Sequence, residues 1–152
     1  MMEKKKKTNR YKRIYDQLTE LLRPQNNEIA AMATIAAVLH HKFDYFFWTG
    51  FYLLTEGELI VGPYQGSVAC IKLNKDTGVC WAGINQKQTI IVPDVHKFPG
   101  HIACDSRSNS EIVVPLRDKT GKIIGVLDVD SKEFNAFDET DREGLENILS
   151  LV

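Results

Sequence analysis

The chain has 152 residues, of which 43% are hydrophobic, 26% charged and 9% aromatic. This size and composition predict one folded domain and exclude a disordered chain, a collagen and a repeat protein. The 19 basic and 20 acidic residues give a formal net charge of −1, which argues against a dedicated nucleic-acid or acidic-membrane binder. The chain has only three cysteines, and an odd, sparse set does not build a secreted disulfide framework. The sequence therefore favours a reducing, cytoplasmic compartment.

The chain begins with a basic segment that contains the lysine run Lys4–Lys7. Polar residues follow it where a signal peptide would need an apolar stretch. The longest apolar run, Ile29–Leu39, is about half as long as a membrane span and is interrupted by Thr34. We therefore predict no membrane segment, a flexible tail over residues 1–10 and a single domain over residues 11–152.

Helical periodicity marks two segments in the first third of the chain. Apolar residues recur at helical spacing over residues 11–22, and Pro24 ends this helix. Asn26 or Asn27 can cap a second helix over the apolar run 29–39.

After residue 45 the pattern changes to that of β-strands separated by turns. One helix opens at Thr77 and Gly78, and a last helix is capped by Asp138. This order predicts an α+β domain, with a central antiparallel sheet, helices on one face and a ligand pocket under loops on the other. Residues 93–110 form a long loop, and such loops are usually functional or disordered. The expected strands are 46–54, 59–61, 68–73, 89–92, 111–116 and 122–130.

Three acidic residues are expected to cluster at the end of one hairpin. Alternation places Asp128 and Asp130 on the same face of a strand that is apolar on both sides and therefore covered twice. If the hairpin pairs as its turn suggests, Glu111 lies beside them. Such a cluster would suit a cation, an amine or a proton donor with a raised pKa. The alternative is a set of strand-end carboxylates that face solvent.

The three cysteines, Cys70, Cys80 and Cys104, are separated by 10 and 24 residues. Cys104 lies in the long loop, where a thiol can be exposed, whereas the other two could be buried and inert. The cysteines could bind zinc with His96 and His101, but no spacing typical of zinc ligands is present, and we predict no metal. Cys104 with one of these histidines could also be an acyl-transfer nucleophile, although no third orienting residue is in view.

Trp48 and Tyr52 are four residues apart on an expected strand and therefore share a face. Aromatic residues in this arrangement usually pack in a core. Gly50 between them leaves space that a ligand could use.

Six segments of the chain carry motifs of a known family: Trp48–Tyr52, Gly62–Gly66, Gly78–Cys80, Pro93–Asp105, Ser108–Pro115 and Gly125–Ser131. They resemble those of the GAF-domain free methionine-(R)-sulfoxide reductases, and the resemblance runs from the first helix to the last. GAF domains that merely bind cyclic nucleotides or pigments lack this set of cysteines. The chain departs from the family pattern at Trp81, because a small residue is expected after the Gly78–Cys80 motif. The bulky Trp81 ring bears on how freely Cys80 can take part in disulfide exchange.

The resemblance implies that the substrate is free methionine-(R)-sulfoxide, that thioredoxin is the external reductant, that no cofactor is bound and that the protein is a homodimer. We expect Glu111 to protonate the sulfoxide oxygen. The group that holds the substrate carboxylate is not assigned; backbone N–H groups of residues 93–110 are candidates. A small-molecule sensor and a thiol redox switch are the alternative functions. The implied roles are Cys104 as attacking cysteine, Cys70 as resolving cysteine, Cys80 as auxiliary thiol, Glu111, Asp128 and Asp130 as ligands of the amino acid, and Trp48 and Tyr52 as walls of the sulfoxide-methyl pocket.

Overall fold

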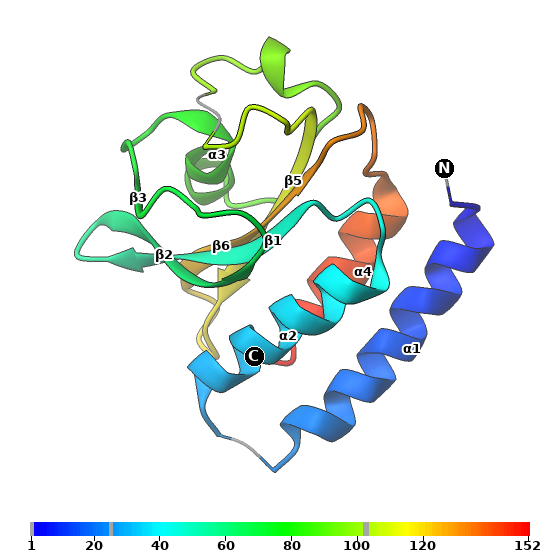
Figure 1. Ribbon diagram of the computed structural model, residues 1–152. Coiled ribbons are helices and arrows are strands. Elements are labelled where there is room, and N and C mark those ends of the chain that lie inside the picture. The colour runs from blue at the N-terminus through cyan, green and yellow to red at the C-terminus, as the bar shows by residue number, and fades with distance from the viewer. Residues whose placement is uncertain (1, 25, 102–103) are drawn as a thin grey trace.

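A six-stranded antiparallel sheet forms the centre of the molecule in the computed structural model, which describes residues 2–24, 26–101 and 104–152 (Figure 1). The strand order is β3-β2-β1-β6-β5-β4. The strands are β1 (Trp48–Thr55), β2 (Glu58–Gln65), β3 (Lys72–Leu73), β4 (Ile90–Val92), β5 (Ser110–Arg117) and β6 (Ile123–Ser131). The helices are α1 (Lys4–Leu22), α2 (Glu28–Lys42), α3 (Gly78–Gln86) and α4 (Glu139–Leu149), with a short 3-10 turn η1 (Val95–Lys97).

Helices α1, α2 and α4 lie on one face of the sheet (Figure 1). Their apolar side chains pack against the residues of β1, β5 and β6 that point to this face, among them Ile112 and Leu127, which are fully buried. The strand alternation predicted for the 111–130 hairpin is confirmed. Val113, which follows Ile112, and Val126, which precedes Leu127, belong to a second core on the opposite face of the sheet. The predicted α+β class is therefore correct.

The opposite face is covered by α3 and by the loops around it. Val79 and Trp81 of α3 are buried against Val113 and Val126 of the sheet. Gly83 permits this close approach, since an added Cβ would lie 2.8 Å from the side chain of Val113. This face therefore combines one short helix with loops, which leaves room for a pocket.

The helix ends agree with the capping residues read from the sequence. The side chain of Asn27 accepts a hydrogen bond from the backbone N–H of Ala30 at the start of α2. Asp138 forms a capping box with Asp141 at the start of α4. No helix in the described part of the chain is long and apolar enough to cross a lipid bilayer.

The prediction of a flexible tail over residues 1–10 is wrong for residues 4–10, which form the first turns of α1. Lys7 is fully buried, and its Nζ lies 2.8 Å from Oδ2 of Asp141 and 3.3 Å from Oδ2 of Asp138. The hydroxyls of Tyr11 and Tyr45 donate to the other oxygen of Asp141, each at 2.7 Å. These partners lie far away in the sequence, so the lysine run alone could not reveal them.

Two strand boundaries also differ from the prediction. The strand expected at 68–73 is only two residues long, because residues 67–71 form a loop instead. By contrast, β2 continues through Gly62–Gln65, a segment expected to be a loop. It pairs with β1 across an irregularity between Gly50 and Tyr52.

Candidate active site

A pocket of about 140 Å³ lies on the face of the sheet that carries α3. Strands β1, β5 and β6 supply its floor, and α3 supplies one wall. Residues 67–70, 100–101 and 104–108 contribute the loop side of the pocket. All the site residues named from the sequence line this pocket, although they come from distant parts of the chain. They are Trp48, Tyr52, Cys70, Cys80, Cys104, Glu111, Asp128 and Asp130.

The three acidic residues are brought together by the register of the β5–β6 hairpin. Glu111 lies directly opposite Asp130, and Val113 lies opposite Asp128. Glu111 and Asp128 are only 5% and 6% exposed, and no lysine or arginine ion pair reaches any of the three acids among the described residues. The three acids of the predicted cluster therefore line one pocket, in which Glu111 and Asp128 are buried and Asp130 is half-buried.

The acids differ in how readily they hold a proton. Burial raises the pKa of Glu111, and the nearby charges of Asp128 and Asp130 raise it further. Burial also raises the pKa of Asp130, again with help from Asp128. Burial raises the pKa of Asp128 as well, but hydrogen bonds from Glu111 and Cys80 oppose this increase, because they favour the charged form. Asp128 is thus the group most suited to carry the negative charge, and Glu111 is suited to keep a proton.

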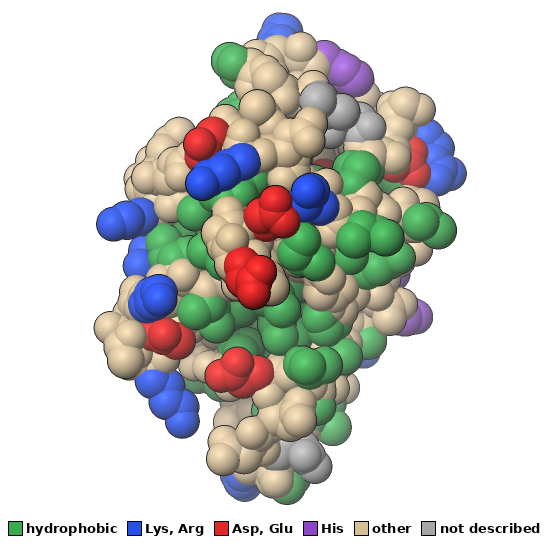
Figure 2. Space-filling model, turned by 90° about the vertical axis from the view of Figure 1, so that its left-hand side faces the viewer, with side chains coloured by type: hydrophobic (Ala, Val, Ile, Leu, Met, Phe, Trp, Pro, Cys, Tyr) green, Lys and Arg blue, Asp and Glu red, His purple; other side chains and the backbone are tan. Residues whose placement is uncertain are grey.

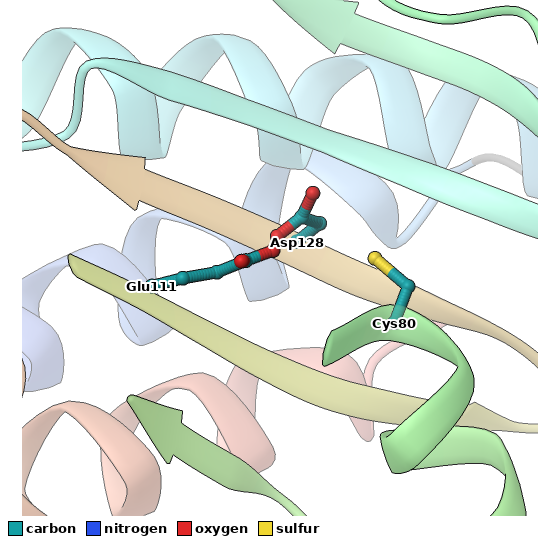
Figure 3. Close-up of side chains that lie close together, drawn as sticks. All are labelled: Cys80, Glu111 and Asp128. Atoms are coloured by element: carbon teal, nitrogen blue, oxygen red, sulfur yellow. The ribbon is translucent and has the colours of Figure 1, made fainter. Parts of the chain in front are cut away.

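Cys80 is a free, buried thiol on α3 that points toward these acids (Figure 3). Its Sγ and one oxygen each of Glu111 and Asp128 all lie within 4.8 Å of one another. Burial, and then the charge of Asp128, raise the pKa of the Cys80 thiol, so it stays protonated. These three groups have donor atoms that could bind a cation. The zinc ligands considered from the sequence, the three cysteines with His96 and His101, are not brought together, because Cys70 and Cys104 are joined in a disulfide.

Cys70 and Cys104 form a disulfide, with their Cα atoms 5.7 Å apart. The bond ties the loop before β3 to the long loop before β5, above the pocket. Cys104 is solvent-exposed and Cys70 is half-buried, so the bond is accessible from outside. The structure thus joins Cys104 to Cys70, the residue that the resemblance implies as the resolving cysteine.

The surface beside Cys70 is apolar. Val68 and Ile71 are 85% and 72% exposed, although both are large hydrophobic residues. Figure 2 shows the side of the molecule that carries β2 and β3, where hydrophobic side chains gather between scattered acidic and basic ones.

The aromatic residues hold the loop that carries Cys70. The indole N–H of Trp48 donates to the carbonyl of Ser67 at 2.9 Å, and the hydroxyl of Tyr52 donates to the carbonyl of Cys70 at 3.1 Å. The two rings stack with centroids 5.8 Å apart. The space that Gly50 was expected to leave for a ligand is filled, because an added Cβ there would lie 2.7 Å from the Trp48 ring.

Trp81, the residue that departs from the expected pattern, does not line the pocket. It packs with Val113 and Val126 in the core beneath α3. The bulky ring therefore does not separate Cys80 from the acids.

The structure adds residues that the motifs did not single out. Asp105 accepts a hydrogen bond from the hydroxyl of Ser67 at 2.9 Å and pairs with Arg107 at 2.6 Å. Hydrogen bonds from Arg107 hold the pKa of the Asp105 carboxyl below its usual range. Asp105, the residue after Cys104, is thus hydrogen-bonded to the loop at residues 67–71, which carries Cys70. Its position next to Cys104 was the only sequence signal that could have suggested this role.

His101 is the other addition to the site. It lines the pocket, and its Nδ1 lies 4.0 Å from Oε1 of Glu111. Its Nε2 is inaccessible to solvent and has no hydrogen-bond partner among the described residues. The sequence had pointed to this histidine only as a zinc ligand or as a base for Cys104.

The sequence matches the GAF domain family over residues 27–152. It is 40% identical to the free methionine-R-sulfoxide reductase of Escherichia coli strain K12, over 95% of this chain and 87% of that protein. The chain belongs to the GAF domain family.

Two further similarities cover nearly the whole of this GAF domain. It is 51% identical to GAF domain-containing protein A of Dictyostelium discoideum, over 99% of this chain and 95% of that protein. The solved free methionine-R-sulfoxide reductase of Neisseria meningitidis, in complex with its substrate, superposes with a TM-score of 0.87. That structure is 40% identical, and the alignment covers 93% of this chain and 84% of the other. Both relatives named as reductases are thus aligned across the strands and loops that build the pocket.

Proposed function

We propose that this protein reduces free methionine-(R)-sulfoxide to methionine. The observation that carries the proposal is the combination of an accessible cysteine pair and three carboxyls, two of them buried and one half-buried, in one pocket. The acids can hold the amino acid, and the cysteines can accept its oxygen. The similarity to relatives named free methionine-R-sulfoxide reductase supports the same reaction.

In the first step, the Cys104 thiolate attacks the sulfoxide sulfur while Glu111 protonates the sulfoxide oxygen. The S–O bond of the substrate breaks, the oxygen transfers to Cys104, and the products are methionine and a cysteine sulfenic acid. Glu111 suits this role because its raised pKa leaves it protonated at neutral pH. It regains its proton from the thiol proton that Cys104 gave up, so protons balance.

In the second step, the Cys70 thiol attacks the sulfenic acid, and a disulfide and one water are formed. The Cys70–Cys104 disulfide of the structure corresponds to this product. An external dithiol, which we propose to be thioredoxin, then exchanges with the disulfide and restores both thiols. No bound cofactor is needed, because the electrons arrive through the thiols.

The carboxyls select the free amino acid. The substrate ammonium would lie against Asp128 and Asp130 and neutralise a negative charge that has no lysine or arginine partner among the described residues. A methionine sulfoxide within a peptide lacks this ammonium and would leave the buried charge unpaired. We further propose that the protein acts in the cytoplasm, where its thiols can be reduced, and that it is a homodimer.

The test is NADPH oxidation coupled through thioredoxin reductase and thioredoxin, with free R, free S and peptide-bound methionine sulfoxide offered in turn. We expect turnover of the free R epimer alone. Absence of turnover, or equal turnover of all three, would overturn the proposal. A small-molecule sensor or a simple thiol switch would give the first of these results.

A further inference from the structure

Two loops must meet in the second step of the proposed reaction. Cys70 lies in the loop at residues 67–71, and Cys104 lies 34 positions later, in the long loop before β5. When Cys104 carries the sulfenic acid, the disulfide does not yet exist to hold the two residues together. Bringing together two segments this far apart in the sequence costs conformational entropy. Other contacts must therefore hold the Cys70 loop against the Cys104 loop.

One hydrogen bond joins these two loops without a sulfur atom. The hydroxyl of Ser67 donates to Oδ2 of Asp105 at 2.9 Å. Ser67 is three residues before Cys70, and Asp105 directly follows Cys104. Among the described residues, no other hydrogen bond connects residues 67–71 with residues 104–108. The Ser67–Asp105 bond is therefore well placed to keep the two cysteines close to each other.

Arg107 fixes the acceptor of this hydrogen bond. Its Nε donates to Oδ1 of Asp105 at 2.9 Å and its Nη2 donates to Oδ2 at 2.6 Å, so both carboxylate oxygens are held. The central carbon of its guanidinium lies 4.7 Å from the centroid of the Phe47 ring. Phe47 directly precedes β1, so Asp105 is held at the start of that strand.

The donor of the hydrogen bond is fixed at the same place. The indole N–H of Trp48, the first residue of β1, donates to the carbonyl of Ser67 at 2.9 Å. Trp48 directly follows Phe47, so two consecutive residues support the two partners of the Ser67–Asp105 bond. None of these contacts involves a cysteine side chain, and they therefore do not require the disulfide.

We propose that Ser67 and Asp105 are positioning residues for disulfide formation, because their hydrogen bond keeps Cys70 next to the oxidised Cys104. This inference rests on the proposed function and adds a role to its second step. There the Cys70 sulfur bonds to the Cys104 sulfur, the S–O bond of the sulfenic acid breaks, and its hydroxyl leaves as water with the Cys70 thiol proton. A thiol that is held beside its target reacts faster than one that must first reach it.

The test measures how the sulfenic acid divides between two products. The reduced, full-length protein turns over one equivalent of free methionine-(R)-sulfoxide in the presence of dimedone, which labels the sulfenic acid on Cys104. Mass spectrometry gives the ratio of labelled Cys104 to Cys70–Cys104 disulfide, and this ratio reports the rate of disulfide formation even when the first step is slower. Ser67→Ala should raise the ratio about 10-fold, as for the loss of one hydrogen bond to a charged group. The rate of methionine formation in the same samples should stay the same.

Further variants separate positioning from a general loss of structure. Ser67→Thr keeps the hydroxyl and should give the wild-type ratio. Asp105→Ala should raise the ratio at least as much as Ser67→Ala, and combining the two substitutions should add nothing, because either one removes the same bond. Ser106→Ala is the matched control, since this exposed serine directly follows Asp105 and its replacement should leave the ratio unchanged.

The inference is overturned if Ser67→Ala leaves the ratio unchanged, if its effect adds to that of Asp105→Ala, or if methionine formation slows by the same factor as disulfide formation. If the wild type forms no methionine, the proposed function fails, and the inference is decided without substrate. The equilibrium constant for forming the Cys70–Cys104 disulfide with oxidised glutathione should then be about 10-fold lower in Ser67→Ala than in the wild type. Equal constants would overturn the inference as well.

Discussion

Glu111 and Asp130 stand directly opposite each other on β5 and β6, and both side chains line the same pocket. With Asp128 they form an acidic group that no lysine or arginine neutralises within the described residues. Such an arrangement destabilises the folded protein without substrate whenever more than one of the three carboxyls is ionised, because burial and mutual repulsion both disfavour the ionised form. The stability of the protein should therefore report on the site.

The first prediction concerns Asp130→Asn. The pKa of Asp130 is raised in the folded protein, so its proton is bound more tightly there than in the unfolded chain. The stabilisation linked to that proton is complete below the unfolded pKa and is lost as pH rises through the folded pKa. At pH 8 the variant should therefore be more stable than the wild type by about 1–3 kcal/mol, and the gain should vanish toward pH 4.

Thermal unfolding at a series of pH values measures this effect. Asp118→Asn is the control, because the pKa of this exposed carboxyl is lowered by hydrogen bonds from Thr120 and its replacement should give no gain at pH 8. A gain for Asp130→Asn that is independent of pH would show that its charge is not the cause.

The second prediction concerns Glu111→Gln. If Glu111 delivers the proton to the sulfoxide oxygen, the amide should slow methionine formation by about 10²- to 10⁴-fold. The wild-type rate should fall as pH rises through the raised pKa of Glu111, and this decline should be absent from the variant. Single-turnover quenching of the reduced enzyme isolates this step from disulfide reduction. An unchanged single-turnover rate would show that Glu111 does not donate the proton to the sulfoxide oxygen.

The third prediction separates the cysteines. Cys104→Ser should form no methionine, and Cys70→Ser should form one equivalent and stop with a sulfenic acid on Cys104. Cys80→Ser should keep repeated turnover, because Cys80 is buried outside the disulfide and its raised pKa keeps it a thiol. Methionine is quantified per enzyme, and the sulfenic acid is trapped with dimedone. A Cys80→Ser variant that stops after one turnover would place Cys80 in the relay.

The fourth prediction concerns the buried ion pair between α1 and α4. Lys7→Met leaves Asp141 buried without its cation and should reduce the free energy of unfolding by about 3–5 kcal/mol. Lys6→Met, one residue earlier on the exposed side of the helix, should change it by less than about 0.5 kcal/mol. Urea unfolding followed by far-UV circular dichroism measures both. Equal effects of the two substitutions would contradict the assigned role of Lys7.

The parts of the fold that were predictable are those with local causes. Asp138 and Asn27 cap helices through bonds to residues two or three positions away, so the capping pattern suffices to place them. Strand alternation likewise predicts that Glu111 and Asp130 share a face, and one tight turn then fixes their register.

The unpredicted parts depend on contacts between distant segments. The helical state of residues 4–10 depends on Asp141, 134 positions after Lys7. Residues 67–71 form a loop rather than a strand because Trp48 and Tyr52 bind their carbonyls. The position of His101, whose Nδ1 lies 4.0 Å from Oε1 of Glu111, also depends on how the chain before β5 folds over the sheet, which a pattern of residue types cannot express.

The hydrogen-bonded order of the strands also determines when the protein can become chemically competent during its synthesis. β1 lies between β2 and β6, so its second neighbour is made about half a chain later. Likewise, α1 is held by an ion pair to α4, which is made well after α1. The thiols of Cys70 and Cys80 therefore leave the ribosome well before the carboxyls of Asp128 and Asp130 that would bring a substrate to them. Contacts of such long sequence separation form late and slowly. A nascent or truncated chain thus carries thiols but no assembled substrate site, and only a completed molecule can begin a catalytic cycle.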